Sequence, residues 1–200
     1  MLDVRTNVQA TPAGRYHVSL AVDDNEIREA QRLRYKVFAE EMGAHLASVL
    51  PGHDIDLYDP FCDHLLVREL ASGEVVGTYR ILPPEAAKRV GSYYSEQEFD
   101  LARLGFLRPR MAELGRSCVH PAHRSGAVIA RLWMGLADYM TRYGYETIVG
   151  CASVGMADGG HIAASVHRQL ASRRSSGASP RAPACRSNRS TMAGMPRCRR

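Results

Sequence analysis

Short apolar runs bounded by turn residues divide most of the chain into predicted β-strands. These runs are Tyr16–Val22, His64–Glu69, Glu74–Leu82, Met111–Val119 and Thr147–Val154. The second and third runs are separated by four residues that include a glycine, which is hairpin spacing. The last run is apolar over most of its length, so we expect it to be a buried strand.

Two segments carry the three-to-four-residue apolar spacing of amphipathic helices. The first covers about Glu26–Glu41, follows a helix-capping sequence at 23–25 and ends at Gly43. The second is Gly126–Tyr143, whose continuous apolar face includes Trp133, so we expect Trp133 in the core. Weaker helical patterns cover 85–90, 95–104 and 159–170.

The most informative stretch is Met111–Tyr143, where a strand passes through the turn 120–127 into the second helix. A helix that starts from such a turn has unpaired N–H groups and a positive dipole end, which together suit a phosphate group. The strand also carries Glu113 and Arg116, and buried charges are costly unless they are paired or used. We predict a phosphate-binding strand–turn–helix with a functional carboxylate beside it.

The connection 44–63 is long for a compact domain and unusually acidic. It contains four aspartates together with Tyr58 and Phe61, and the aspartates are Asp54, Asp56, Asp59 and Asp63. Long loops inside compact domains are usually functional or disordered, and the aromatic residues favour a functional loop.

The net charge of +5 is unevenly distributed along the chain. Eight of the 26 Lys and Arg residues lie in 171–200, which holds no acidic residue, so 1–170 carries 18 basic and 21 acidic residues, a net −3. A nucleic-acid-binding function is therefore not expected. We predict a loose arm at 1–15 and one domain at 16–170. The Arg/Ser/Pro-rich segment 171–200 is either a basic disordered tail or, as we favour, a frameshifted translation.

The cysteines and the hydropathy exclude several classes of protein. No two cysteines have CxxC spacing and no Cys/His cluster has metal-ligand spacing, so we expect buried free thiols and no metal site. No secretory-leader pattern and no run of 18 apolar residues stands out, so we expect neither secretion nor a membrane span. We expect a cytoplasmic protein without a bound cofactor.

The order of strands and helices, with a phosphate-type turn after the fourth strand, suggests an acyltransferase. The sequence resembles the GNAT superfamily, and within it the ornithine–acyl-carrier-protein N-acyltransferases (also called hemolysin-like), which are related to acyl-homoserine-lactone synthases. The resemblance implies an α/β GNAT-like fold, a mixed central sheet flanked by helices, here expected to lack its last two strands. The residues that carry it are Arg34–Phe38, Asp56–Asp59, Cys62–Leu65, Gly77–Pro83, Glu113–Arg116, Val154–Gly160 and Leu170.

The resemblance also implies roles for individual residues. Glu113 and Arg116 are the expected catalytic residues, with Glu113 accepting a proton from the attacking amine. The expected substrate-binding residues are Arg34, Phe38, Asp56, Asp59, Asp63 and Arg80. The turn is shorter than usual in the superfamily, which suits the phosphopantetheine arm of an acyl carrier protein, and the residues expected to hold it are Val119, Arg124, Ser125, Gly126 and Ala127.

Several of these residues have a second interpretation. The three arginines could lock the acidic loop through ion pairs instead of binding a carboxylate, and Glu113 could be an ion-pair partner of Arg116 or Arg80. Backbone N–H groups near 117–119 could polarise the thioester carbonyl. His120 and His123 could meet phosphate or the carrier protein. A thiol-protonating role for His167 and a nucleophilic role for Cys118 are weaker alternatives.

The function that the resemblance implies is transfer of a 3-hydroxyacyl chain from acyl carrier protein to the α-amino group of ornithine, giving lyso-ornithine lipid. The expected partners are acyl carrier protein, ornithine and the inner-membrane surface. One alternative is an acyl-homoserine-lactone-type synthase that uses S-adenosylmethionine, although no obvious aromatic residue follows Phe38 at the expected distance. Another is an inactive remnant that only binds carrier protein.

Overall fold

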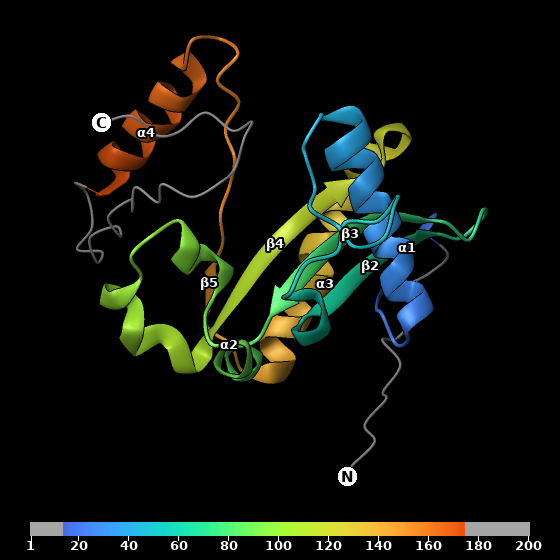
Figure 1. The fold of residues 1–200 in the computed structure, drawn as a ribbon, viewed down its shortest axis with the longest axis horizontal. Helices are drawn as coiled ribbons and strands as arrows, with labels where there is room; N and C mark the ends of the chain where they lie inside the picture. Colours follow the sequence, from blue (N-terminus) through green and yellow to red (C-terminus); the bar gives the residue numbers. More distant parts are fainter. Residues whose placement is uncertain (1–13, 175–200) are drawn as a thin grey trace.

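A single mixed sheet organises the chain. The computed structural model describes residues 14–174, and in this range five strands lie side by side in the order β1-β2-β3-β4-β5 (Figure 1). Neighbouring strands from β1 to β4 are antiparallel, whereas β5 runs parallel to β4. The strand bounds are β1 Tyr16–Leu20, β2 Asp63–Glu69, β3 Val75–Leu82, β4 Met111–Val119 and β5 Thr147–Val149.

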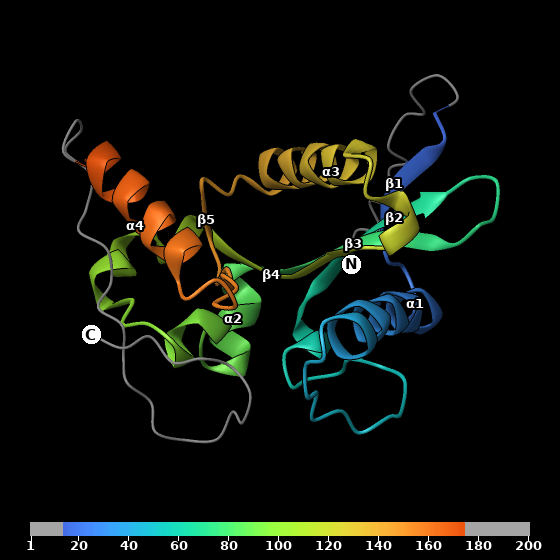
Figure 2. The same ribbon diagram turned by 90° about the horizontal axis from the view of Figure 1, so that it is seen from above.

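The two main helices cover opposite faces of this sheet (Figure 2). Helix α1, Asp24–Tyr35, packs on one face and continues into a π-helical turn at Lys36–Glu41. Helix α3, Ala127–Tyr143, packs on the other face. The remaining helices are α2 (Pro84–Val90), α4 (His161–Arg174) and four 3₁₀ segments, Asp59–Phe61, Tyr94–Gln97, Ala102–Arg110 and Pro121–His123.

Close approach between α3 and the sheet depends on two glycines. A Cβ atom on Gly77 of β3 would lie 2.5 Å from Val128, and one on Gly135 of α3 would lie 2.7 Å from Val18. Such distances are too short for any side chain, so both positions must be glycine for α3 to pack this closely. The helix thereby buries Val128, Leu132, Leu136 and Tyr139 against the strands.

Strand β4 carries an irregularity next to the predicted catalytic residues. Its pairing with β3 shifts between Cys118 and Gly115, so that one extra residue stands on β4. Arg116, inside this bulge, has a φ of 53°, which is uncommon for a residue other than glycine. In the part of the chain that the structure describes, β5 pairs with β4 only as far as Glu113, and the chain then diverges from β4 towards α4 (Figure 1).

Most of the expected elements are present. The prediction for Met111–Val119 is confirmed at both ends, the hairpin between β2 and β3 is confirmed, and Gly144 ends α3 with a φ of 69°. Asp23 caps α1 by accepting the Glu26 N–H at 2.9 Å, so the predicted helix start is also confirmed. The mixed α/β sheet flanked by helices is the fold that the sequence analysis expected.

Four expectations were wrong. Strand β5 ends at Val149 instead of residue 154, and its side chains are half-buried or exposed. Within residues 14–174, β4 is the one strand that pairs with it. The segment 95–104 forms 3₁₀ turns instead of one helix. Trp133 is 52% exposed, because the buried face of α3 contains the neighbouring Leu132 and Leu136 instead. The Trp133 ring contacts the Tyr79 ring edge-on. Cys151 is exposed, whereas Cys118 is buried as expected and Cys62 is intermediate.

Helix α4 continues to Arg174, past the expected domain end at residue 170. The rest of the predicted N-terminal arm and the rest of the 171–200 segment, with Cys185 and Cys198, lie outside the described residues. Among residues 14–174, none of the helices is long and apolar enough to span a bilayer.

Candidate functional site

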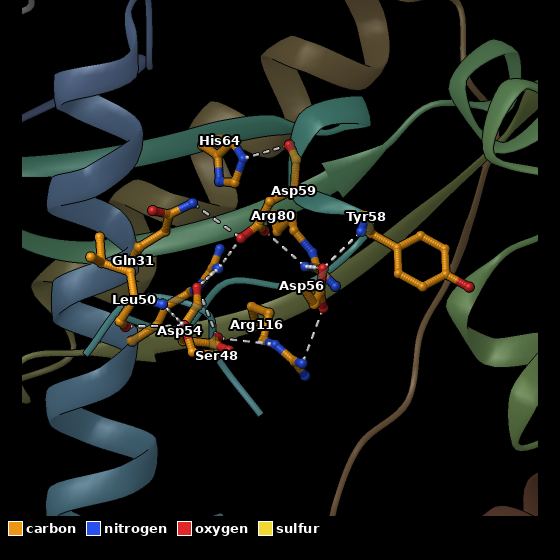
Figure 3. Close-up of polar contacts among 11 residues, drawn as sticks. Gln31, Ser48, Leu50, Asp54, Asp56, Tyr58, Asp59, His64, Arg80 and Arg116 are labelled. Carbon is orange, nitrogen blue, oxygen red and sulfur yellow. Dashed lines mark hydrogen bonds and ion pairs between the residues drawn. The ribbon is translucent and has the colours of Figure 1, made fainter. Parts of the chain in front are cut away.

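The acidic loop is held under α1 by a buried arginine. Arg34 is fully buried and its Nε donates to Asp54 at 2.9 Å, while Nη2 donates to Asp59 at 2.7 Å and to the backbone carbonyl of Asp54. Figure 3 shows the acceptors Asp54 and Asp59 of the loop near Arg80. Gln31, about one helical turn before Arg34 in α1, also donates to Asp59 at 3.2 Å. The guanidinium of Arg34 is thus enclosed between helix and loop.

Two arginines from the sheet complete this network. Arg80 on β3 donates to Asp56 at 2.6 Å and to Asp59 at 2.9 Å. Arg116, from the bulge in β4, donates to Asp56 at 3.1 Å, and its Nε lies 3.1 Å from Asp54 at ion-pair distance but without hydrogen-bond alignment. Three arginines therefore face three aspartates, and this geometry favours the loop-locking interpretation of these residues.

Ion pairing decides the charge state of the network. Burial alone would raise the pKa of Asp59, but the charges and hydrogen bonds of Arg34 and Arg80 outweigh it and hold that pKa below its ordinary value. His64 lies beside Asp59 and its pKa is lowered by burial, so the imidazole is neutral at pH 7. The loop is a charge-balanced structural unit.

Glu113 lies in a different environment at the point where β4 and β5 separate. Glu113 is 5% exposed, and no arginine forms an ion pair with it among the described residues. Instead, Oε2 accepts the Tyr94 N–H at 2.6 Å, and Oε1 accepts the Ser95 N–H at 2.6 Å together with the Ser95 hydroxyl. The expected alternative, an ion pair with Arg116 or Arg80, is absent from this geometry.

The pKa of Glu113 moves in the opposite direction to that of Asp59. Burial raises it, and the hydrogen bonds from Ser95 and Tyr94 and the charge of Arg80 offset this only in part. A buried carboxylate with a raised pKa and no counterion is suited to accept and release a proton.

The predicted phosphate turn folds as a 3₁₀ turn that leads into α3. Gly126 has a φ of 91° and caps α3 without a side-chain hydrogen bond. Arg124 forms a two-pronged ion pair with Glu41 at 2.5 and 2.7 Å. His120 lies 2.9 Å from Lys36, and the buried His123 lies 3.0 Å from the Tyr16 hydroxyl.

The remaining predicted residues are spread around these two centres. Asp63 accepts a 2.6 Å hydrogen bond from Tyr139 of α3, away from the other aspartates. Phe38 lies in the π-helical turn and packs against the core cluster under α1. His167 is exposed on α4. Cys118 is buried, and burial raises the pKa of its thiol to about 12, which does not suit a nucleophile.

The sequence analysis did not single out Tyr94, Ser95 or Cys151 as site residues. Tyr94 and Ser95 open a 3₁₀ segment whose N–H groups point at Glu113, and Cys151 donates to the Ser95 hydroxyl at 3.4 Å. A glutamate in a buried part of a strand indicates that another segment supplies hydrogen-bond donors to its carboxylate. Nothing in the spacing of these residues identifies which segment supplies them.

Comparisons with known proteins agree on the family. Residues 33–134 match the family described as acetyltransferase (GNAT) domain. The chain is 43% identical over 147 residues to a Rhodobacter capsulatus protein named L-ornithine N(alpha)-acyltransferase, covering 69% of this chain and 56% of that one. A Brucella abortus protein of the same name is 41% identical over 149 residues, covering 70% and 53%. The chain thus spans about half the length of these curated relatives.

A solved structure with the same fold is that of the AHL synthase LasI. It superimposes with a TM-score of 0.54 at 20% identity, covering 80% of this chain and 78% of that one. This likeness supports the arrangement of strands and helices described above.

Proposed function

Because the chain belongs to the GNAT acetyltransferase family, we propose that it is an N-acyltransferase that acts on the α-amino group of ornithine. The proposal rests on the names of relatives that are 43% and 41% identical to it. The donor that we propose is a 3-hydroxyacyl chain on the phosphopantetheine of acyl carrier protein, and the product would be lyso-ornithine lipid. The chain would act in the cytoplasm, with its lipid product entering the inner-membrane surface.

The observation that carries the mechanism is that Glu113 is buried and forms no ion pair among the described residues. The amine nitrogen attacks the thioester carbonyl, a C–N bond forms and the C–S bond breaks. Glu113 takes the proton that the amine must lose, either directly or through a water molecule. This proton then passes through solvent to the departing thiolate, which leaves as the free thiol and returns Glu113 to its carboxylate form. A raised pKa supports this role, because a base whose pKa lies closer to the operating pH accepts the proton more readily.

The bulge in β4 supports a second part of the mechanism. Its position, beside the point where β5 leaves β4, would direct backbone N–H groups of 117–119 towards a carbonyl held between the strands. Arg116 would then fix the bulge through the acidic loop, instead of touching the substrate. The start of α3 at Gly126 and Ala127 would receive the phosphate of the carrier arm, with Val119, Arg124 and Ser125 around it.

The test is an assay of the purified chain with 3-hydroxyacyl-carrier protein and ornithine, read by mass spectrometry. We expect N-acylated ornithine and free carrier thiol in equal amounts. Acyl-homoserine lactone formed from S-adenosylmethionine, with no acylated ornithine, would overturn the proposal. Binding of carrier protein without turnover of either substrate would instead support the inactive-remnant alternative.

A further inference from the structure

Ser95 contacts Glu113 through both its backbone and its side chain. Its side chain is 1% exposed, its hydroxyl donates to Glu113 Oε1, and its own N–H donates to the same oxygen at 2.6 Å. The hydroxyl oxygen also receives the Cys151 thiol at 3.4 Å. Cys151 follows β5 and Ser95 precedes β4, so this chain of three side chains joins segments on both sides of Glu113.

We propose that Ser95 is a positioning residue that fixes the Glu113 carboxylate so that Oε2 is the oxygen that receives the proton of the amine. The proposal rests on the proposed function, in which Glu113 is the base. It adds the residue that orients this base, and it assigns different roles to the two carboxylate oxygens.

The hydrogen-bond count supports the assignment. Each oxygen of an ionised carboxylate can accept two hydrogen bonds in its plane. Oε1 has two donors, the N–H and the hydroxyl of Ser95, and is therefore saturated. Among the described residues Oε2 has one donor, the Tyr94 N–H at 2.6 Å, so one of its lone pairs remains for a substrate proton.

Cys151 explains why the Ser95 hydroxyl points at Glu113. A hydroxyl has one hydrogen to donate, and it donates to the better acceptor in reach. Although Cys151 as a residue is exposed, its thiol contact with Ser95 is partly buried, and this partial desolvation raises the pKa of the thiol. Cys151 therefore stays protonated and donates to Ser95 instead of competing for its hydrogen. The direction of the chain is thus from thiol to hydroxyl to carboxylate.

Other ionisable groups act on Glu113 from several elements. Arg80 faces it from β3, and its charge favours the carboxylate. Tyr93 acts from the segment before β4, and Cys62 and Cys151 act from the segments next to β2 and β5. Tyr93 and Cys62 are neutral at pH 7, since burial raises the pKa of each to about 12. Ser95 is the only side chain whose hydroxyl reaches Glu113 among the described residues.

The test compares Ser95→Ala with two other variants. In Ser95→Ala the carboxylate loses one donor, so the pKa of Glu113, followed by carbon-13 NMR of the carboxyl group, should rise above that of the unmodified chain. Ser95→Thr keeps the hydroxyl and should restore the original midpoint. Ser92→Ala removes a hydroxyl from the same segment that contacts Tyr58 and not Glu113, and should leave the midpoint unchanged.

A kinetic measurement separates positioning from simple folding. In Ser95→Ala we expect kcat to fall roughly 10- to 100-fold, the effect of losing a hydrogen bond to a charged group, with KM for ornithine little changed. The acidic limb of the pH–rate profile should move to higher pH. An unchanged midpoint and an unchanged kcat in a folded Ser95→Ala chain would overturn the inference.

The two proposals fail in different ways. If the unmodified chain does not acylate ornithine, the proposed function fails, whereas the titration of Glu113 in Ser95→Ala still reports on its positioning. If the unmodified chain acylates ornithine and Ser95→Ala has the same Glu113 midpoint and kcat, the inference about Ser95 is wrong and the proposed function stands.

Discussion

Asp59 and Glu113 are both buried acids in the same sheet-and-loop region, yet their surroundings are opposite. Asp59 is 3% exposed and shares hydrogen bonds with two guanidinium groups, those of Arg34 and Arg80. Glu113 is 5% exposed and is held by backbone N–H groups and a serine hydroxyl. The pKa of Asp59 is lowered and that of Glu113 is raised.

The difference shows what burial alone does not decide. Removing a carboxylate from water favours its neutral form, and positive charges and hydrogen-bond donors oppose this. At Asp59 the two guanidinium groups outweigh burial, whereas at Glu113 the hydrogen bonds and the charge of Arg80 do not. The carboxylate of Asp59 is ion-paired and therefore has a structural role. The carboxylate of Glu113 has no ion-pair partner and is protonated more easily. Direct hydrogen bonds from guanidinium groups therefore distinguish the structural acid Asp59 from the candidate base Glu113.

The largest expected effect comes from removing Arg34 from the arginine–aspartate network that holds the acidic loop. Arg34→Met would leave Asp54 with Arg116 and Asp59 with Arg80 and Gln31, both still buried. The variant should lower the free energy of unfolding by about 3–5 kcal/mol in a urea titration. Arg32→Met, on the same helix but exposed, is the matched control and should change it by less than about 1 kcal/mol. Similar small losses in both variants would show that the network is not a lock.

Glu113→Gln should have the reverse profile, with a large effect on turnover and a small one on stability. We expect acyl transfer to fall on the order of 10²- to 10⁴-fold, because the amide cannot accept the proton. The amide nitrogen would face the Tyr94 N–H, at a cost of about 1–2 kcal/mol in unfolding free energy. Glu98→Gln, an exposed glutamate in the same segment, should keep full activity. Full activity in Glu113→Gln would remove Glu113 as the base.

The two acids should also respond to pH with opposite signs. The folded pKa of Asp59 lies below its unfolded value of about 3.9, so its contribution is present above that value and is lost as pH falls through the folded pKa. The folded pKa of Glu113 lies above its unfolded value of about 4.3, so stability from this group is present below that value and is lost as pH rises through the folded pKa.

Urea titrations of the unmodified chain, Asp59→Asn and Glu113→Gln across pH 3–8 measure these contributions. Relative to Asp59→Asn, the unmodified chain should lose stability on acidification; relative to Glu113→Gln, it should lose stability as pH rises above about 4.3. Differences of the same sign for both variants would contradict the comparison.

The smallest expected effect comes from the edge of the lock. Asp56 contacts Arg80 and Arg116, but its side chain is 22% exposed, and water screens such pairs. Asp56→Asn should therefore lower the free energy of unfolding by about 0–1 kcal/mol in the same urea assay. A loss as large as that of Arg34→Met would mean that the rim and the centre of the network are equally important.

The sequence predicts the backbone of this site better than its contacts. The strand Met111–Val119, the turn and helix α3 follow from apolar periodicity and from Gly126 and Gly144, which are local signals. The family resemblance also identifies Glu113 and the three arginines. The pairing of each arginine with an aspartate was only one of two interpretations, because a choice of partners 20 to 60 residues apart along the chain depends on tertiary packing.

Two features could not be read from local patterns. Ser95 lies in a segment with weak periodicity, and its contact with Glu113 exists only because the 3₁₀ turn at Tyr94–Gln97 packs against β4. Trp133 belongs to an apolar face that is wider than the stripe the sheet can cover, so periodicity alone placed it in the core.

The most direct test of the account is to titrate both acids in one sample. Carbon-13 NMR of the Asp and Glu carboxyl groups, with Asp59→Asn and Glu113→Gln used to assign the two signals, gives both midpoints in the folded chain. The account predicts a midpoint for Asp59 below the ordinary aspartate value of about 3.9 and one for Glu113 above the ordinary glutamate value of about 4.3. A Glu113 midpoint at or below that ordinary value would contradict its assignment as the base.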